Sequence, residues 1–328
     1  MLRALLAELP QVRPHDVTIL IATGTHRANT PAELEAMLGR DVLASGCRVL
    51  NHDCRDASTL ALAGHTSTGV PVWLNREWLA ADVRLTTGFV EPHFFAGFSG
   101  GPKMVAPGLA GLETVLVLHD ARRIAHPRAT WGVTEGNPIH DDVREIARMT
   151  GVTFALDVTL DPAKRITGVF AGELLAEHAA ACAAAKQAAM RRVEAPFDVV
   201  LTSNSGYPLD QNHYQAVKGM SAAAQIVRDG GTIVAAAECR DGIPAHGAFG
   251  RLLAERPGPD ALLDMITAPG FAQQDGWQVQ VQAQIQRRAR VLVKAGGLAP
   301  EALQAAHLTP VADVTRDRPR RRSSSPVG

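Results

Sequence analysis

The segment that decides the fold is DVTILIATGTHR, residues 16–27. Its first eight residues are mostly apolar or β-branched, which is typical of a strand buried on both faces. GTHR, residues 24–27, ends this pattern with a glycine and a histidine. A helix is predicted next, at residues 31–43, with Thr30 as its cap and Pro31 in its first turn. The segment therefore predicts one strand, turn and helix of a parallel α/β unit.

The same alternation continues on both sides of a long alanine-rich helix predicted at residues 173–192. The strands predicted before it are residues 47–51, 69–75 and 81–88. After it, a strand begins in PFDVVLTSNSGYP, a helix follows around residues 214–228, and a second strand is predicted at residues 231–238. Ligands of such folds bind beyond the carboxyl ends of the strands.

These patterns predict two α/β domains with mostly parallel sheets and an active site in the interdomain cleft. We expect an N-terminal domain at residues 1–194 and a C-terminal domain at residues 195–313. Residues 314–328, rich in arginine and serine, are expected to form a disordered tail.

Composition excludes several classes of partner. Lysine plus arginine and aspartate plus glutamate both total 33, so no net charge attracts the chain to nucleic acid or to an anionic membrane. The four cysteines lack disulfide or zinc-site spacing, and the N-terminus lacks a signal-peptide cleavage site. We expect a cytoplasmic protein that binds a small molecule.

Two histidines follow predicted strands, at the place where α/β folds assemble their sites. His26 lies in GTHR and His93 lies in EPHFFAGFSGGPK, residues 91–103. A bond to a backbone carbonyl is the commoner role of either histidine alone, whereas the two together favour a functional site. GFSGGPK is not a P-loop, because Lys103 follows a proline and no serine or threonine comes next. An anion-binding loop and a simple turn explain it equally well.

The ordered set GTHR, EPHFFAGFSGGPK, His119 in VLVLHDARRI and YQAVKGM resembles the lactate racemase family. The resemblance extends from about Val17 to Gln282. It implies a nickel-pincer nucleotide, in which a carbon and two sulfur atoms of a pyridinium mononucleotide hold nickel together with one protein histidine. It also implies a 2-hydroxy acid substrate and partner enzymes that synthesise the cofactor.

The resemblance implies a role for each matching residue. His26 and His93 are expected as the catalytic acid and base, and His119 as the nickel ligand. The other matching residues are expected to contact the cofactor or the substrate. For the cofactor they are Lys103, as a possible covalent tether, Gly100, Gly101 and Trp277, and for the substrate Tyr214, Gln215 and Lys218.

Racemisation explains why two histidines are needed. The C2 hydrogen of lactate is a poor acid beside a carboxylate, so it leaves more readily as hydride, to a cofactor, while a base takes the hydroxyl proton. Each enantiomer needs its own base, and histidines with pKa values near 6.5 serve at cellular pH.

Simpler readings remain for several residues. His119 also suits a buried histidine at a helix end, Tyr214 and Lys218 suit a surface pair on one helix face, and Trp277 suits a core position. Asp141 and Asp142 are expected to cap a following helix.

The family's acidic-x-x-Arg motif, which grips the substrate carboxylate, would fall before Met1. We therefore expect that the first strand of the N-terminal domain and this arginine are lacking. Two alternatives stay open: a metal-dependent hydrolase that uses the same histidines, and an inactive, truncated homologue that binds the cofactor.

Overall fold

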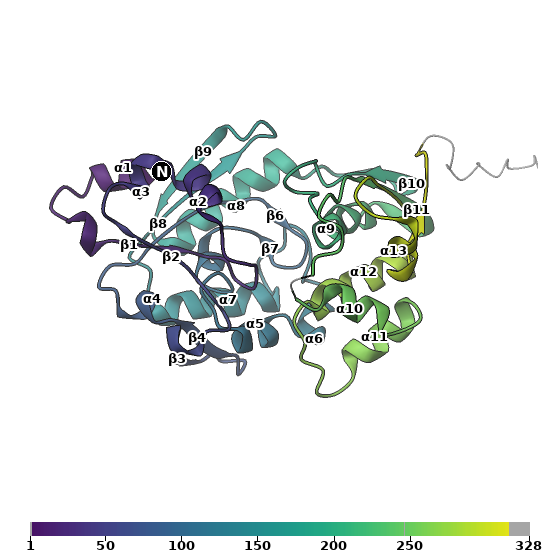
Figure 1. Cartoon of the computed structure of the whole chain (residues 1–328), viewed down its shortest axis with the longest axis horizontal. Helices are drawn as coiled ribbons and strands as arrows, with labels where there is room; N and C mark the ends of the chain where they lie inside the picture. Colours follow the sequence, from purple (N-terminus) through teal and green to yellow (C-terminus); the bar gives the residue numbers. More distant parts are fainter. Residues whose placement is uncertain (1, 246, 315–328) are drawn as a thin grey trace, which may run out of the picture. The chain divides into compact units, whose positions relative to one another are not determined.

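The chain divides into two compact units, unit 1 (Met1–Arg191) and unit 2 (Arg192–Gly328). The computed structural model describes residues 2–245 and 247–314. The division lies three residues before the boundary expected at 194/195. All of the tail expected at residues 314–328 except Val314 lies outside the described residues. Figure 1 labels many of the helices and strands of both units.

Unit 1 combines short strands with helices of very different length. Its elements, in chain order, are α1 (Leu2–Ala7), η1 (Pro14–Asp16), β1 (Thr18–Ile21), α2 (Pro31–Leu38), α3 (Arg40–Leu43), β2 (Arg48–Asn51), η2 (Ala57–Thr59), β3 (Leu60–His65), β4 (Pro71–Asn75), α4 (Arg76–Ala80), β5 (Leu85–Phe89), β6 (Pro92–His93), β7 (Gly97–Phe98), η3 (Gly101–Met104), α5 (Leu112–Leu118), α6 (Ala121–Ile124), α7 (Pro138–Thr150), β8 (Phe154–Leu160), β9 (Ile166–Gly172) and α8 (Leu174–Ala189).

The strands of unit 1 form small sheets, in which parallel and antiparallel pairs are mixed. β1 pairs with β2 in parallel, and β5 pairs with β8 in parallel, as the alternating pattern predicts. β4, which matches the strand predicted at residues 69–75, instead pairs with β3 in an antiparallel hairpin. The turn of residues 66–70 is too short for the crossover that a parallel pair needs, and Gly69 has a φ of +85° there.

The helix predicted at residues 31–43 is two helices. Gly39 separates α2 from α3 with a φ of +82°, outside the helical region. Thr30 does cap α2, since its side chain accepts from the N–H of Glu33 while the Glu33 carboxylate accepts from the N–H of Thr30. The prediction was therefore correct for the start of the helix and wrong for its continuity.

The expectation that Asp141 and Asp142 cap a helix was wrong. α7 begins at Pro138 and is capped by Asn137, whose side chain accepts from the N–H groups of Ile139 and His140. Asp141 and Asp142 therefore lie within the helix, and Asp142 is 1% exposed.

The core of unit 1 positions the loop that carries Lys103. Phe98 of β7 packs in one buried cluster with Ala181, Cys182 and Ala185 of α8. In Figure 1, α8 lies against β8 and β9, and the contacts between these elements agree. The Lys103 loop, residues 91–103, is thus packed against α8, which in turn packs on β8 and β9.

Unit 2 is built on a four-stranded parallel sheet with the order β10-β11-β12-β13, and α9 and α12 pack against it. Its elements are β10 (Phe197–Thr202), α9 (His213–Ala224), β11 (Val227–Ala237), α10 (Phe249–Ala254), α11 (Pro259–Thr267), α12 (Gly276–Arg288), β12 (Arg290–Ala295), α13 (Pro300–Ala305) and β13 (Thr309–Pro310). α9 ends before the predicted residue 228, because Val227 already pairs with Phe197 of β10.

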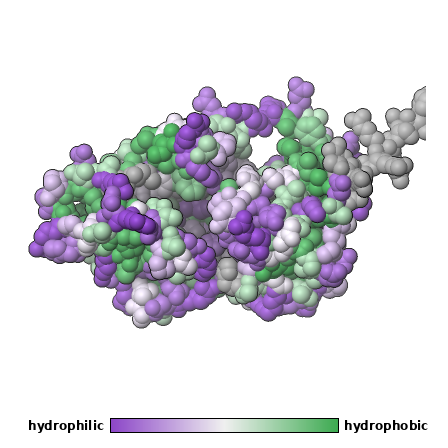
Figure 2. Space-filling view, turned by 45° about the horizontal axis from the view of Figure 1, so that its top comes forward, coloured by the Kyte–Doolittle hydropathy of each residue, from purple (hydrophilic) through white to green (hydrophobic). Residues whose placement is uncertain are grey.

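Two surface properties bear on the class of partner. None of the helices in residues 2–245 and 247–314 combines the length and hydrophobicity that a membrane-spanning segment needs. On the face drawn in Figure 2, hydrophobic and hydrophilic residues are intermixed.

Candidate active site

The Lys103 loop begins with a hairpin of two short strands, each two residues long. Pro92 of β6 pairs with Phe98 of β7, and His93 pairs with Gly97. A Cβ atom on Gly97 would lie 2.1 Å from the carbonyl oxygen of Val133, so only glycine fits there. η3 follows directly and carries Lys103, whose N–H donates to the carbonyl of Gly100 over 3.1 Å.

Gly100 and Gly101 pack against side chains of the protein itself. Their φ angles are +72° and +50°. A Cβ atom on Gly100 would lie 2.7 Å from Oδ2 of Asp157, and one on Gly101 would lie 2.4 Å from the ring of His178. The N–H of Gly101 donates to Asp157 Oδ2 over 2.6 Å. These contacts account for both glycines without a ligand, and a role of the two in cofactor binding stays a prediction.

Asp157 and Glu177 form a buried acidic pair behind this loop. Asp157 of β8 is 0% exposed and Glu177 of α8 is 5% exposed. Burial raises the pKa of Asp157, and it raises the pKa of Glu177 to about 8, helped by the charge of Asp157. Neither carboxyl oxygen of Glu177 has a hydrogen-bond partner in residues 2–245 and 247–314. At neutral pH Glu177 therefore holds a proton.

Two buried histidines fix the same loop from behind. His140 Nδ1 donates to the carbonyl of Ala96 over 3.1 Å, and His178 Nε2 donates to the carbonyl of Ser99 over 2.9 Å. Their rings stack with centroids 5.6 Å apart. Burial lowers the pKa of His140 to about 3 and that of His178 to about 4, so both are neutral donors.

His93 and His119 both contact the ring of Phe95. The Phe95 centroid is 4.6 Å from that of His93 and 5.1 Å from that of His119, edge-on in both cases. Two predicted site residues that are far apart in sequence are thus brought close together. Phe95 itself is buried.

The hydrogen bond at Nδ1 determines the tautomer of His119. His119 ends α5 and is 8% exposed. Its Nδ1 lies 2.9 Å from the carbonyl oxygen of Val115, which can only accept, so Nδ1 carries the proton and Nε2 carries the lone pair. Burial, together with the nearby positive charge of Lys103, lowers the pKa of His119 to about 4. A neutral imidazole with its lone pair on Nε2 is the form that binds a transition metal.

His93 has the opposite tautomer. Its Nδ1 accepts from the backbone N–H of Ala96 over 3.2 Å, which places the proton of the neutral ring on Nε2. In this state His93 can donate a hydrogen bond from Nε2. To accept a proton there, it must first exchange its tautomer and give up the bond to Ala96.

His26 lies in a loop joined to the Lys103 loop through the backbone. The N–H of Gly24 donates to the carbonyl of Gly108, and the N–H of Gly108 donates to the carbonyl of Lys103, over 3.0 and 3.1 Å. The His26 side chain is exposed, and the next residue, Arg27, forms an ion pair with Glu33 of α2 over 2.6 Å. Main-chain hydrogen bonds thus join the two loops.

The predicted residues of unit 2 form a group of their own. Trp277 of α12 donates from Nε1 to the hydroxyl of Tyr214 over 2.9 Å. Tyr214, Gln215 and Lys218 all lie in the first two turns of α9, which Asn212 caps by accepting from the N–H of Gln215. Burial raises the pKa of the Tyr214 hydroxyl, so it stays protonated. Tyr214 and Trp277 thus meet where α9 packs against α12.

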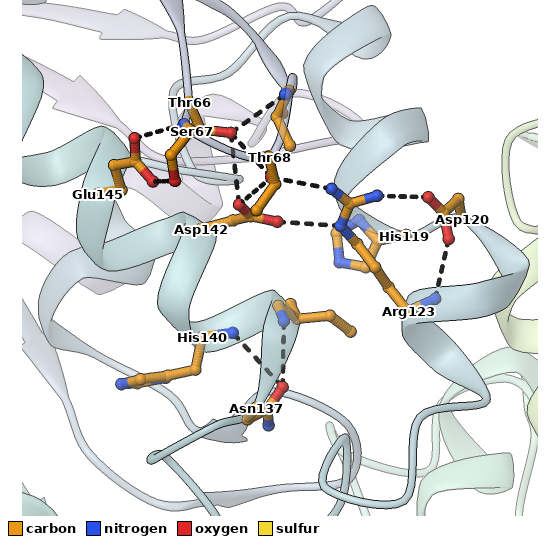
Figure 3. Close-up of polar contacts among 12 residues, drawn as sticks. Thr66, Ser67, Thr68, His119, Asp120, Arg123, Asn137, His140, Asp142 and Glu145 are labelled. Atoms are coloured by element: carbon orange, nitrogen blue, oxygen red, sulfur yellow. Dashed lines mark hydrogen bonds and ion pairs between the residues drawn. The ribbon is translucent and has the colours of Figure 1, made fainter.

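A polar network beside His119 was not predicted (Figure 3). It joins Asp120 and Arg123, which follow His119, to Asp142 of α7 and to Thr68 in the turn of residues 66–70. The signal that could have revealed it is the acidic-x-x-Arg spacing of DARR, residues 120–123. Asp157 offered a comparable signal, as the single charge in the strand FALDVTL, residues 154–160.

Metal-ligand geometry distinguishes two classes of enzyme. Within residues 2–245 and 247–314, no group of three or more histidine, cysteine, aspartate or glutamate side chains is arranged to hold a metal. A catalytic zinc site uses three protein ligands. A metal held mainly by an organic cofactor needs only one, and His119 has the form to supply it.

Comparison with known proteins assigns the family. The model of the lactate racemase N-terminal domain matches residues 1–132, and the model of the lactate racemase C-terminal domain matches residues 193–318. The lactate racemase of Thermoanaerobacterium thermosaccharolyticum is 38% identical over 301 residues, 91% of this chain and 70% of that protein. The lactate racemase of Lactiplantibacillus plantarum is 36% identical over 311 residues, 94% of this chain and 72% of that protein.

Solved structures agree. The lactate racemase apoprotein from T. thermosaccharolyticum superposes with a TM-score of 0.90 at 36% identity, covering 96% of this chain and 75% of that one. A protein from Thermotoga maritima shares the fold, with a TM-score of 0.72 at 20% identity over 90% of this chain and 79% of that one. On these matches, which extend over both units, the chain belongs to the lactate racemase family of isomerases.

Proposed function

We propose that this chain is a racemase or epimerase that interconverts the enantiomers of a 2-hydroxy acid, with lactate as the first substrate to test. The observation that carries the proposal is the pairing of the family match with His119, a buried neutral histidine whose tautomer suits a metal. We propose a nickel-pincer nucleotide as the cofactor, and cofactor-synthesis enzymes as partners of the chain.

The residues of unit 1 fit such a cofactor. His119 would hold the nickel through Nε2, and Lys103, which lies close enough to affect the pKa of His119, would tether or pair with the nucleotide. When bound, the cofactor would accept the hydride that leaves C2 of the substrate. We further propose a cytoplasmic location, because all four cysteines are buried and unpaired by disulfides.

Proton transfer is the task of the two loop histidines. His26 and His93 would each take the hydroxyl proton from one enantiomer and return it to the other. In the tautomer set by Ala96, His93 Nε2–H would donate a hydrogen bond to the substrate oxygen, so the base that starts the reaction from this state would be His26. In unit 2, Lys218 would pair with the substrate carboxylate. Tyr214 and Gln215 would also contact the substrate, and Trp277 would contact the cofactor.

The test is a comparison of histidine variants in chain co-expressed with the cofactor-synthesis enzymes. We expect His26→Ala and His93→Ala to lower the racemisation rate by about 10²- to 10⁴-fold, since that is the usual contribution of general acid–base catalysis. Both variants should retain nickel, whereas His119→Ala should lose it and Lys103→Ala should lose any added cofactor mass. His65→Ala, an exposed histidine of β3, is the matched control.

Chiral assay of lactate, metal analysis and intact-protein mass together separate the alternatives. Full activity in both His26→Ala and His93→Ala would refute the two-base mechanism. Cofactor and nickel without turnover by the unaltered chain would identify an inactive homologue. Activity with added metal alone would support a hydrolase, for which the described residues offer no three-ligand site.

A further inference from the structure

The residue after His119 begins a buried charge network. Asp120 caps α6, its Oδ1 accepting from the N–H of Arg123 over 2.8 Å. The Arg123 guanidinium then donates from Nη1 to Asp120 Oδ2 over 2.5 Å and from Nε to Asp142 Oδ2 over 2.9 Å. Its Nη2 donates to Thr68 Oγ1 over 3.1 Å. One side chain thus binds three segments of unit 1 (Figure 3).

The network is shielded from water at its centre. The Asp142 side chain is 1% exposed and that of Arg123 is 15% exposed, whereas that of Asp120 is 35% exposed. The second oxygen of Asp142 accepts from Thr68 over 2.5 Å and from Thr66 over 3.3 Å. Charge-assisted bonds in such surroundings hold a fixed geometry, because each of the three guanidinium nitrogens donates to an acceptor.

The turn of residues 66–70 is held to α7 a second time. Ser67 donates from its N–H and its hydroxyl to the two carboxylate oxygens of Glu145, over 2.5 and 2.7 Å. α7 and this turn therefore form a rigid frame on one side of Arg123. The chain at residues 119–120 is the part that the guanidinium attaches to that frame.

His119 lies at the corner where α5 ends and α6 begins. Its ring is fixed through Val115 to the last turn of α5, which runs directly into this corner. α5 itself is attached to β4, since the Thr114 hydroxyl accepts from the N–H of Trp73 over 2.9 Å and donates to the carbonyl of Pro71 over 2.7 Å. Thr114 fixes the helix before the histidine, and Arg123 fixes the chain after it.

We propose that Arg123 is a positioning residue for His119, acting through Asp120 and Asp142. Its guanidinium holds the corner against α7 and so places the His119 ring. The link to nickel rests on the proposed function, whereas the placement of the ring is a property of the chain without cofactor. The two parts therefore have separate readouts.

The first readout is the Nδ1–H resonance of His119 in ¹⁵N-histidine-labelled apoprotein, assigned by its loss in His119→Gln. Arg123→Met should shift or broaden this resonance. That variant leaves the buried Asp142 carboxylate without its counter-charge, so a second variant, Arg123→Met with Asp142→Asn, removes both charges. The double variant should recover stability while its His119 resonance stays altered. A purely structural role predicts that both recover.

The second readout is the nickel affinity of the cofactor-loaded enzyme. Loss of a residue that orients a metal ligand typically lowers affinity about 10- to 100-fold, and we expect this for both Arg123→Met and the double variant. Arg123→Lys should rescue in part, because an ammonium group cannot bridge two carboxylates as a planar fork does. Arg165→Met, which breaks an exposed pair with Asp161 in the β8–β9 hairpin, should leave both readouts unchanged.

The proposal is overturned if the folded double variant keeps the wild-type His119 resonance and nickel affinity. If His119→Gln itself retains nickel, the proposed function fails instead. The apoprotein resonance then still decides whether Arg123 places the ring.

Discussion

At the scale of single residues, backbone hydrogen bonds give the two site histidines of the Lys103 region opposite tautomers. His119 donates from Nδ1 to Val115, and His93 accepts at Nδ1 from Ala96. The motifs were sufficient to nominate both residues, but not to assign their protons. A tautomer depends on which backbone group lies beside the ring, and no spacing in the sequence specifies that.

A prediction at this scale concerns Gly101. Gly101→Ala should lower the free energy of unfolding by about 3 kcal/mol, because the new methyl group meets the His178 ring at a backbone angle that suits glycine. Gly69→Ala is the matched control, with a φ of +85° and nothing within 4 Å of its Cβ position, and should cost about 1 kcal/mol. Urea unfolding measures both, and equal losses would show that the His178 contact is unimportant.

At the scale of elements, positions were easier to predict than pairing. The four strands predicted in unit 1 all exist, with ends shifted by a few residues. The antiparallel pairing of β4 was missed, because β3 is a strand of small residues, LALAGH, without a strong periodic signal. The break at Gly39 was missed because an isolated glycine also occurs inside helices.

The helix caps of unit 1 support a second prediction. Asn137 is 0% exposed and, besides capping α7, donates to the carbonyls of Phe95 and Val133, each over 2.9 Å. Asn137→Ala should therefore cost about 3 kcal/mol, from a lost cap and two buried carbonyls without a donor. Thr30→Ala, at the exposed cap of α2, should cost about 1 kcal/mol. Thermal unfolding of both variants tests this, and a smaller loss for Asn137→Ala than for Thr30→Ala would contradict it.

At the scale of the whole molecule, the candidate site residues divide between the units. Unit 1 contains His26, His93, Lys103 and His119, and unit 2 contains the α9 and α12 residues. Family resemblance predicted this division, since ordered motifs carry the residues of both units. The buried supports of unit 1, Asp157 and Arg123 above all, were missed because their partners come from distant segments.

Buried histidines make unit 1 sensitive to acid. Burial lowers the pKa of His119 to about 4, of His140 to about 3 and of His178 to about 4, against 6.5 unperturbed; in unit 2, His213 falls to about 4. Below pH 6.5 these histidines bind protons in the unfolded chain but stay neutral in the folded one. The free energy of unfolding therefore falls as the pH is lowered from 6.5 to about 4. Glu177 acts oppositely: its pKa of about 8 gives stability that is present below 4.5 and lost as the pH rises through 8.

The prediction is that unit 1 loses more stability than unit 2 between pH 7 and pH 5, by on the order of 1 kcal/mol, because protonation of Glu177 offsets part of the loss from the three histidines. Tryptophan fluorescence during urea unfolding reports both units, and a Trp277→Phe variant restricts the signal to Trp73, Trp78 and Trp131 of unit 1. An unchanged urea midpoint of unit 1 at the two pH values would contradict the prediction.

The packing of Gly100 and Gly101 around Asp157 and His178 also constrains how this protein can evolve. A larger side chain at either glycine is compatible only with a smaller or displaced group at its partner, so single changes fail where paired changes succeed. The four positions, from η3, its preceding loop, β8 and α8, should therefore vary together or not at all. Sequence change at these four positions is limited by how their groups pack against one another, independently of any ligand that Lys103 binds.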